Sequence, residues 1–371
     1  MLEQRLLEKA IGEPGRLIAV EPFGHGSIAR FTIDAGERAG DWFVDTSRQP
    51  VAEETGFVIR SHEGTVARIW QHPLDPRLPA LRTAVDPERL ARIAGAAGSE
   101  GEIEARVLAY RPGRRAVVRL TQHGVHLFVK VVRPGEAEEL VAIHEACRAA
   151  GVPAPEVAHW SPSGVVVVRD AVGTPGPVVA ARMPAAELLD AVDALREALL
   201  GVRTRRIARA SVGVRLDWHV ERLAAGLPER AADVRALLPG LLANVRRVGP
   251  PQVIHGDLHI GQIFCTDGAV SSVIDVDTTG LGDPSDDCAA FVGHAIASAV
   301  RNEVAGRSAD AAVLQGIAGA AAERWLVDAH TTALTTLHLL GHAIRIVDRN
   351  PAAAHLLLDR ALVTGGIRPA S

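Results

Sequence analysis

Two carboxylates in the second half of the chain have the sequence context of a phosphoryl-transfer site. Asp257 lies in the stretch His255-Gly-Asp-Leu-His-Ile-Gly-Gln262, and Asp275 directly follows the short apolar run Val273-Ile274. In phosphoryl transfer, one carboxylate accepts the proton of the attacking hydroxyl and another holds the magnesium ion that bridges the nucleotide phosphates. The pattern therefore predicts Asp257 as the catalytic base and Asp275 as a magnesium ligand.

Two nearby residues leave alternatives open. Asp277 follows Asp275 by two positions, so in an extended strand both side chains point to the same face. Asp277 is then either a second metal neighbour or an acceptor contact. The side-chain carbonyl of Gln262 can contact a metal ion, and the alternative is an ordinary polar residue that opens a strand over 262–265. His259, in the same stretch, is a candidate acceptor contact.

A lysine in the first half of the chain is the candidate nucleotide contact. Lys9 and Lys130 are the two lysines among 40 basic residues, and Lys130 lies within the apolar run Leu127-Phe-Val-Lys-Val-Val132. A lysine in such a strand needs an anion to offset its desolvation, which the phosphates of ATP supply. The alternative is an exposed lysine on an edge strand. Three glutamates are candidates for holding the ammonium group, with Glu139 the best placed: Glu138, Glu139 and Glu145.

Composition excludes several classes of function. The net charge of −4 gives no basic footprint for nucleic acid, and no apolar run reaches the ~18 residues of a membrane span. Three cysteines without paired spacing indicate a reducing compartment. The first nine residues form an amphipathic pattern with acids and do not resemble a signal peptide. We therefore expect a cytoplasmic protein without a membrane or nucleic-acid partner.

The pattern of elements predicts an α+β fold in three parts. Short strands separated by turns fill the first part at 16–20, 28–33, 41–44, 56–60 and 65–70, followed by a short helix at 87–97 and a linker at 95–101. Strands at 106–111, 116–121, 127–132 and 164–169, with a helix at 136–150, form the second part. The remainder is mainly helical, with expected helices at 185–200, 216–225, 231–248, 286–300, 311–345 (broken) and 352–364. The predicted domains are 1–98, 99–178 and 179–371.

Other catalytic motifs are absent from the sequence. It holds no Gly-x-x-x-x-Gly-Lys-Ser/Thr and no Gly-x-Ser-x-Gly, which excludes a P-loop and argues against a serine hydrolase. His255 and His259 have metal-like spacing but lie in a glycine-containing loop, where we expect His255 to brace the loop by hydrogen bonds. His338 and His342 are expected on a packed helix face or a pocket wall.

Together these residues resemble the aminoglycoside phosphotransferase and choline kinase superfamily, which has a two-lobed protein-kinase-like fold. The matching motifs are His255-Gly-Asp257, Ile274-Asp275 and Gly282-Asp-Pro-x-x-Asp287. The resemblance implies Asp257 as catalytic base and Asp275 as magnesium ligand. Gln262 stands where that family usually has Asn. The stretch 255–262 is similar to a sugar-kinase branch that includes maltokinases and bacterial glucosamine kinases, whose extra N-terminal cap domain accounts for residues 1–98.

The resemblance implies ATP and Mg²⁺ as cofactors and D-glucosamine, phosphorylated at the 6-hydroxyl, as the sugar acceptor. A cationic amino sugar needs carboxylates near its ammonium, and Asp217 and Glu221, with Trp218 nearby, could share one helix face. Asp277 is a further candidate. The alternatives are maltose, another hydroxylated metabolite or an aminoglycoside as acceptor, or a nucleotide-binding pseudokinase that has lost turnover.

Overall fold

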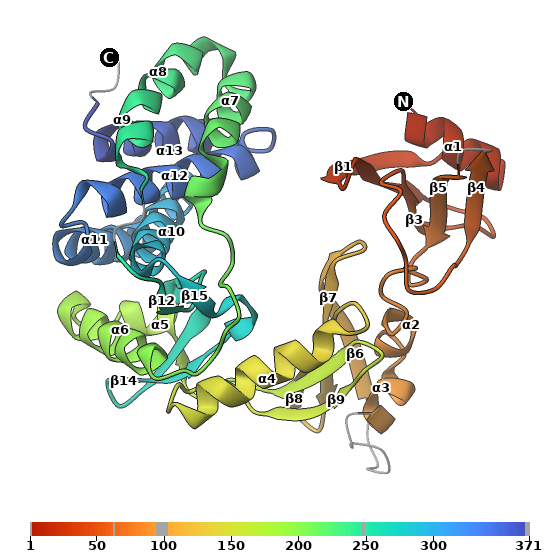
Figure 1. The fold of residues 1–371 in the computed structure, drawn as a ribbon, viewed down its shortest axis with the longest axis horizontal. Helices are drawn as coiled ribbons and strands as arrows, with labels where there is room; N and C mark the ends of the chain where they lie inside the picture. Colours follow the sequence, from red (N-terminus) through yellow and green to blue (C-terminus); the bar gives the residue numbers. More distant parts are fainter. Residues whose placement is uncertain (1, 62–63, 94–102, 247–248, 368–371) are drawn as a thin grey trace. The chain divides into compact units, whose positions relative to one another are not determined.

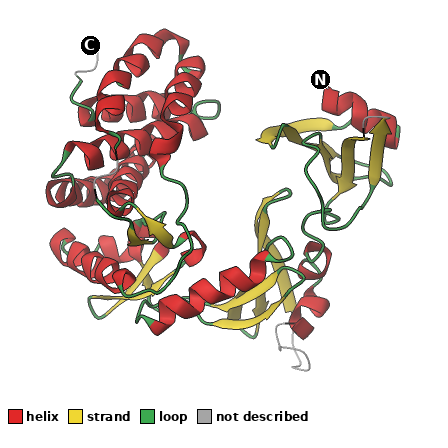
Figure 2. Ribbon diagram, viewed as in Figure 1, coloured by secondary structure: helices red, strands yellow, loops and turns green. Residues whose placement is uncertain are grey.

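The computed structural model describes residues 2–61, 64–93, 103–246 and 249–367. The chain forms two compact units: residues 1–142 with 156–170, and residues 143–155 with 171–371. Strands dominate the first unit and helices the second (Figures 1 and 2). The predicted α+β class is confirmed. The predicted linker at 95–101 and the last four residues of the predicted helix at 87–97 lie outside the described residues, and the three domain boundaries remain a prediction.

The N-terminal part of the first unit is an antiparallel sheet covered by a helix. Its strands run in the order β1-β2-β3-β5-β4: β1 (Arg16–Phe23), β2 (Gly26–Ile33), β3 (Gly40–Asp45), β4 (Phe57–Ser61) and β5 (Gly64–Gln71). Helix α1 (Leu2–Ile11) buries Leu6, Leu7 and Ile11 against Phe31, Trp42 and Ile69 of the sheet. All five strands predicted for this part are present.

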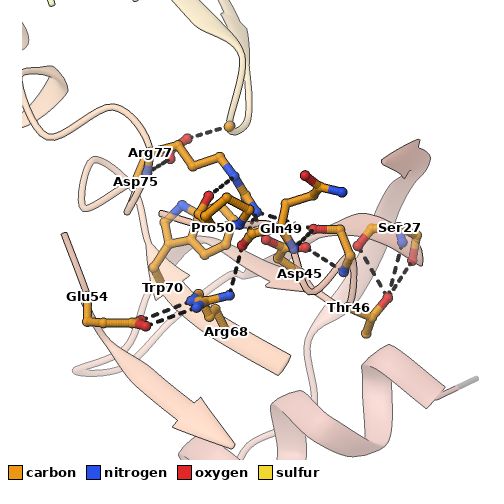
Figure 3. A network of polar contacts seen from close by, with 12 residues as sticks. Ser27, Asp45, Thr46, Gln49, Pro50, Glu54, Arg68, Trp70, Asp75 and Arg77 are labelled. Atoms are coloured by element: carbon orange, nitrogen blue, oxygen red, sulfur yellow. Dashed lines mark hydrogen bonds and ion pairs between the residues drawn. The ribbon is translucent and has the colours of Figure 1, made fainter. Parts of the chain in front are cut away.

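A buried ion pair holds the loops beside this sheet (Figure 3). The Arg77 guanidinium donates to the Asp45 carboxylate at 2.6 Å, and the two side chains are only 3% and 0% exposed. Arg77 also donates to the backbone carbonyls of Pro50 and Gln49. Because a charge removed from water is costly without a partner, this pair ties β3 to the Pro-rich segment that follows β5.

The same Pro-rich segment contacts the second sheet of the unit. The Asp75 carboxylate accepts hydrogen bonds from the Tyr110 hydroxyl at 2.8 Å and from the Gly113 amide at 2.7 Å. Phe43 packs edge-on against Tyr110 with ring centroids 5.3 Å apart. Helices α2 (Leu81–Ala84) and α3 (Pro87–Ile93) contribute to the core of the second sheet. The cap expected at residues 1–98 is therefore packed onto the sheet that follows it.

The second sheet has the order β6-β7-β8-β10-β9 and is antiparallel. Its strands are β6 (Ile103–Arg111), β7 (Arg115–Gln122), β8 (Val125–Val131), β9 (Val157–Ser161) and β10 (Val165–Arg169). Helix α4 (Glu136–Ala149) joins β8 to β9. Strand β9 was not predicted, because it is short, most of its residues are exposed and its sequence, VAHWS, lacks a regular alternation of apolar and polar residues. The four strands predicted for this part are confirmed.

The second unit is a helical bundle with two small sheets. Strands β11 (Thr174–Pro175), β13 (Ile263–Thr266) and β14 (Ala269–Val273) form one sheet, and β12 (Gln252–Ile254) pairs with β15 (Gly280–Gly282). The helices are α5 (Gly176–Ala180), α6 (Ala185–Leu200), α7 (Leu216–Gly226), α8 (Ala231–Ala236), α9 (Leu238–Asn244), α10 (Pro284–Val304), α11 (Ser308–Trp325), α12 (Ala329–Ile346) and α13 (Pro351–Thr364). The 3₁₀ turns are η1 (Val212–Arg215), η2 (Pro228–Arg230), η3 (Ile260–Gln262) and η4 (Val276–Thr278).

Two differences from the predicted helices have local causes. The helix expected at 231–248 is two short helices, α8 and α9, with Pro239 in the first turn of α9, and Val248 lies outside the described residues. The expected break within 311–345 occurs at Asp328, whose side chain accepts from Thr331 N and starts α12. None of the helices in the described ranges is both long and apolar enough to cross a bilayer.

Candidate active site

The loop that carries Asp257 is anchored by a buried carboxylate from another element. Asp287, in the first turn of α10, accepts from the backbone amides of His255 and Gly256, each at 2.8 Å. Gly256 has a φ of +82°, and a Cβ at this position would meet Thr278 O at 2.6 Å. The loop conformation therefore requires glycine next to Asp257.

A second set of hydrogen bonds joins this loop to the one that carries Asp275. His255 Nε2 donates to Ile274 O at 3.0 Å, which confirms that His255 braces the loop. The Thr278 hydroxyl is 2.8 Å from His255 O and 3.1 Å from Asp275 O. These contacts hold the segments of Asp257 and Asp275 side by side.

The predicted extended geometry at Asp275 and Asp277 is wrong. Strand β14 ends at Val273, and Asp275 has a left-handed backbone with a φ of +60°. Residues 276–278 then form η4, closed by a hydrogen bond from Thr279 N to Val276 O. The two carboxylates are therefore separated by a tight turn and do not share a strand face. Asp tolerates the left-handed region better than most residues, because its short polar side chain can bond to nearby backbone.

Gln262 lies beside the Asp275 segment with a buried amide. It ends η3 and does not open β13, contrary to the predicted strand at 262–265. Its backbone carbonyl accepts from Ile274 N at 2.9 Å, the residue before Asp275. The side chain is 4% exposed, and among the described residues its Oε1 finds no hydrogen-bond donor. A buried carbonyl oxygen without a donor is a suitable ligand for a hard cation.

The segment Gly282-Asp-Pro-Ser-Asp-Asp287 starts α10. Asp283 Oδ1 accepts from Ser285 N at 3.0 Å as the N-cap, and Pro284 occupies the first helical position. Asp283 Oδ2 is 2.9 Å from His330 Nε2 on α12. This cap fixes the start of α10, and thereby the position of Asp287 next to the loop that carries Asp257.

Asp257 lies at the surface of a pocket within the second unit. The pocket, of about 380 Å³, is formed by the segment 209–215, α7, the Asp257 loop, α10 and α12. Arg209 Nη1 donates to Asp257 Oδ2 at 2.7 Å, and His294 Nε2 lies 3.8 Å from Oδ1. The carboxylate is partly exposed and faces a space within the usual range of small-ligand pockets, about 300–1,000 Å³.

A group of histidines surrounds Asp257. His294 stacks on His259 with centroids 4.2 Å apart and meets His342 edge-on at 4.3 Å. Burial lowers the pKa of His294, His342 and His259, and lowers that of His338 to about 4. These side chains are therefore neutral near pH 7 and offer hydrogen-bonding groups without charge. His338 and His342 line the pocket, as one of the two readings of their spacing predicted.

The acidic residues predicted to face an amino group do not line this pocket. Asp217 is exposed beside a separate hollow formed with Leu242 and Val245. Glu221 is exposed and bound in two places by Arg235, at 3.0 and 2.8 Å. Of the three residues predicted on α7, Trp218 alone borders the pocket that holds Asp257, with its side chain 52% exposed.

The predicted nucleotide contacts lie in the first unit. Lys130 occupies β8, between β7 and β10, and is 8% exposed, so the reading of an exposed edge-strand lysine is wrong. Leu140, Ile143 and Cys147 are buried along α4, as expected. Glu139 is exposed and makes no ion pair with the described residues, so its pairing with Lys130 remains a prediction.

Several site residues had no sequence signal. Arg209 belongs to an arginine-rich segment whose pairing with Asp257 is visible only in three dimensions. His294 and Asp286 lie on one face of α10, and Arg345 lies on α12 in series with His338 and His342. Their spacing is that of a helix face, which sequence alone cannot distinguish from a packed or solvated one.

Comparisons with known proteins agree with this geometry. The model of the phosphotransferase enzyme family matches residues 106–326. The fold resembles an apo thermostable mutant of aminoglycoside phosphotransferase APH(4)-Ia, with a TM-score of 0.52 and 15% identity over 75% of this chain and 97% of that chain. It also resembles a ternary complex of another thermostable mutant of that enzyme with AMP-PNP and hygromycin B, with a TM-score of 0.52 and 15% identity over 76% and 98% of the two chains. No curated protein matches the sequence.

The solved structures show the protein-kinase-like fold, and the family match covers more than half of the 371 residues. The prediction of a small-molecule kinase is thereby confirmed at the level of enzyme class. The chain belongs to the phosphotransferase enzyme family.

Proposed function

We propose that this protein transfers the γ-phosphoryl group of ATP to a hydroxyl of a small carbohydrate-like acceptor, with Asp257 as the catalytic base. The supporting observation is the position of Asp257, on a loop anchored by Asp287 and open to a pocket of about 380 Å³. A hydroxyl in that pocket can donate its proton to the carboxylate as its oxygen attacks. Arg209 orients the carboxylate through a 2.7 Å hydrogen bond, and His294 lies beside it.

The residues beside Asp257 fit a magnesium ion. Asp275 supplies a carboxylate, and Gln262 supplies a buried amide oxygen without a donor among the described residues. When bound, magnesium would neutralise charge on the nucleotide phosphates. The described residues contain no group of three or more His, Cys, Asp or Glu side chains placed for a metal. Magnesium does not need such a group, because it commonly takes one or two protein ligands with phosphate and water.

ATP is the proposed donor, with Lys130 as its phosphate contact and Glu139 as the candidate partner of that lysine. The position of Lys130 in the central strand β8, 8% exposed, supports this role, because a phosphate contact needs an ammonium group held at a fixed place. AMP-PNP in the similar APH(4)-Ia complex is consistent with an adenine nucleotide. A cytoplasmic location remains part of the proposal.

The acceptor proposed from the sequence resemblance is D-glucosamine, phosphorylated at the 6-hydroxyl. The exposed ring of Trp218 at the pocket supports a sugar, since aromatic faces pack against apolar ring surfaces. Maltose and an aminoglycoside are the alternatives within the same chemistry. His259 is a proposed acceptor contact, and the role of Asp277 as metal neighbour or acceptor contact stays open.

A coupled ADP-release assay with ATP and magnesium tests this function. The acceptor panel is glucosamine, N-acetylglucosamine, glucose, maltose and kanamycin, and Asp257→Asn is the control. We expect acceptor-dependent turnover that falls about 100-fold or more in the variant, with ATP affinity unchanged. ATP binding without turnover of any acceptor would favour a pseudokinase. Full activity of Asp257→Asn would show that Asp257 is not the catalytic base.

A further inference from the structure

The pocket beside Asp257 has a surplus of positive charge. Its lining contains three guanidinium groups and two carboxylates: Arg209, Arg215, Arg345, Asp257 and Asp286. The four histidines of the lining have pKa values lowered mainly by burial and add no charge near neutral pH: His219, His294, His338 and His342. A pocket built for a cationic acceptor would have the opposite balance.

The hydrogen-bond and ion-pair partners of the two carboxylates show which arginines carry the surplus positive charge. Asp257 is already paired with Arg209 at 2.7 Å. Asp286 accepts from the Ser211 hydroxyl at 2.7 Å, and burial raises its pKa to about 6. Asp257 is therefore engaged by Arg209, while Asp286, which remains largely ionised at pH 7, forms no ion pair with either of the other two arginines within the described residues.

Arg215 and Arg345 carry the surplus of positive charge in the pocket lining. Both are exposed, and neither forms an ion pair with any residue in the described ranges. They reach the same pocket from different elements, Arg215 from the end of η1 and Arg345 from the last turn of α12. Guanidinium groups bind carboxylates and phosphates through paired hydrogen bonds, so two of them in the lining of one pocket favour an anionic ligand.

The rest of the lining suits a hydroxylated molecule. Neutral histidines can donate to or accept from sugar hydroxyls, and Trp218 offers an exposed aromatic face.

Resting on the proposed function, we propose that the acceptor carries an anionic group, as a sugar acid or a sugar phosphate does. Arg215 and Arg345 bind that anion while Asp257 faces the hydroxyl that receives the phosphoryl group. This acceptor class differs from the amino sugar indicated by sequence resemblance.

Kinetics on the full chain with four acceptors test the charge preference. The acceptors are D-glucuronate, D-glucose 1-phosphate, D-glucose and D-glucosamine, so the first two distinguish a carboxylate from a phosphate. We expect one of the acids to have a KM about tenfold or more below that of glucose. A KM for both acids equal to or above that of glucose, while glucose or glucosamine is phosphorylated, overturns the inference and leaves the kinase function standing.

Two substitutions and a matched control assign the effect to the arginines. Arg215→Gln and Arg345→Gln should each raise the KM of the preferred acid about tenfold or more, and by a larger factor than they raise the KM of glucose. Arg349→Gln, one turn beyond Arg345 and absent from the lining, should change neither. An equal loss of kcat/KM for the acid and for glucose would contradict anion recognition by these arginines. Arg345→Glu should shift preference from the acid toward glucosamine.

A chain that releases ADP with none of the acceptors would count against the proposed function. Calorimetric titration of the protein with the same four compounds then measures the charge preference of binding independently of turnover. Tighter binding of an acid than of glucose, lost in Arg345→Gln, supports the anion site. Equal binding of all four compounds, or no binding, overturns it.

Discussion

Arg209 Nη1 lies 2.7 Å from Asp257 Oδ2, although 48 positions separate the two residues in the sequence. The Arg209 backbone is itself fixed, because its amide donates to Thr278 O in the turn after Asp275. One backbone contact and one ion pair therefore link Arg209 to both carboxylate loops. A guanidinium in this position restricts the rotamers of the Asp257 carboxylate.

Arg209 is expected to position Asp257. Arg209→Gln should lower kcat about tenfold, because a charge-assisted hydrogen bond contributes roughly 1.5–3 kcal/mol and each 1.4 kcal/mol is a factor of ten. The KM for ATP should remain unchanged, and Arg209→Lys should recover part of the loss. Arg205→Gln, an exposed arginine in the same segment, is the control. An equal effect of the Arg205 and Arg209 substitutions would indicate a general charge effect.

Asp275 and Gln262 are expected to set the magnesium requirement. Asp275→Ala should shift the magnesium titration of ADP release to at least tenfold higher concentrations, because one of two proposed protein ligands is lost. Gln262→Leu, which keeps the buried volume but removes the oxygen, should shift the titration in the same direction. Magnesium titrations that coincide with the wild-type curve would exclude both residues as ligands.

The Arg77–Asp45 pair is expected to stabilise the first unit strongly. Arg77→Ala leaves a buried carboxylate without its cation and should cost about 3–5 kcal/mol in the free energy of unfolding. Arg82→Ala breaks an exposed pair with Glu53 and should cost less than about 1 kcal/mol. Urea unfolding followed by tryptophan fluorescence reports on this unit through the buried Trp42 and Trp70. If both variants lose a similar free energy of unfolding, burial does not determine how much these ion pairs contribute to stability.

His338 is expected to make stability depend on pH. Its pKa is lowered by burial to about 4 from 6.5, so between these values the unfolded chain binds a proton that the folded chain does not. The contribution of His338 to stability is therefore complete above pH 6.5 and is lost as the pH falls toward 4.

Thermal unfolding at pH 7.5 and pH 5 measures this contribution as a difference between variants. His338→Gln should reduce the change in Tm between the two pH values, whereas substitution of the exposed His25 should leave it unchanged. The comparison between variants is needed because Asp286, with a pKa raised to about 6, acts in the opposite direction. A change in Tm that is the same in wild type and His338→Gln would contradict the proposed linkage.

Local patterns were sufficient for most elements and for the carboxylate motifs. Short apolar runs separated by turn residues predicted all five strands of the first sheet, and helical periodicity predicted α6 with the bounds that it has in the structure. Strand β9 was missed, because it is short and mostly exposed and lacks a regular alternation of apolar and polar residues. The turn at Asp275 was also not predicted, because a single left-handed residue after a strand leaves no periodic signal in the sequence.

By itself, the sequence determined the fold class, the segments that carry Asp257, Asp275 and Gln262, and a chemistry of phosphoryl transfer, since those depend on short-range order along the chain. Tertiary structure decided the charge around Asp257. Arg209 and Arg215 come from the segment 209–215, His294 from α10 and Arg345 from α12, and they meet only when these parts of the chain pack together. Glu221, which the sequence offered as an acceptor contact, is instead paired with Arg235. Electrostatic environment is a property of distances in space, and spacing along the chain does not contain it.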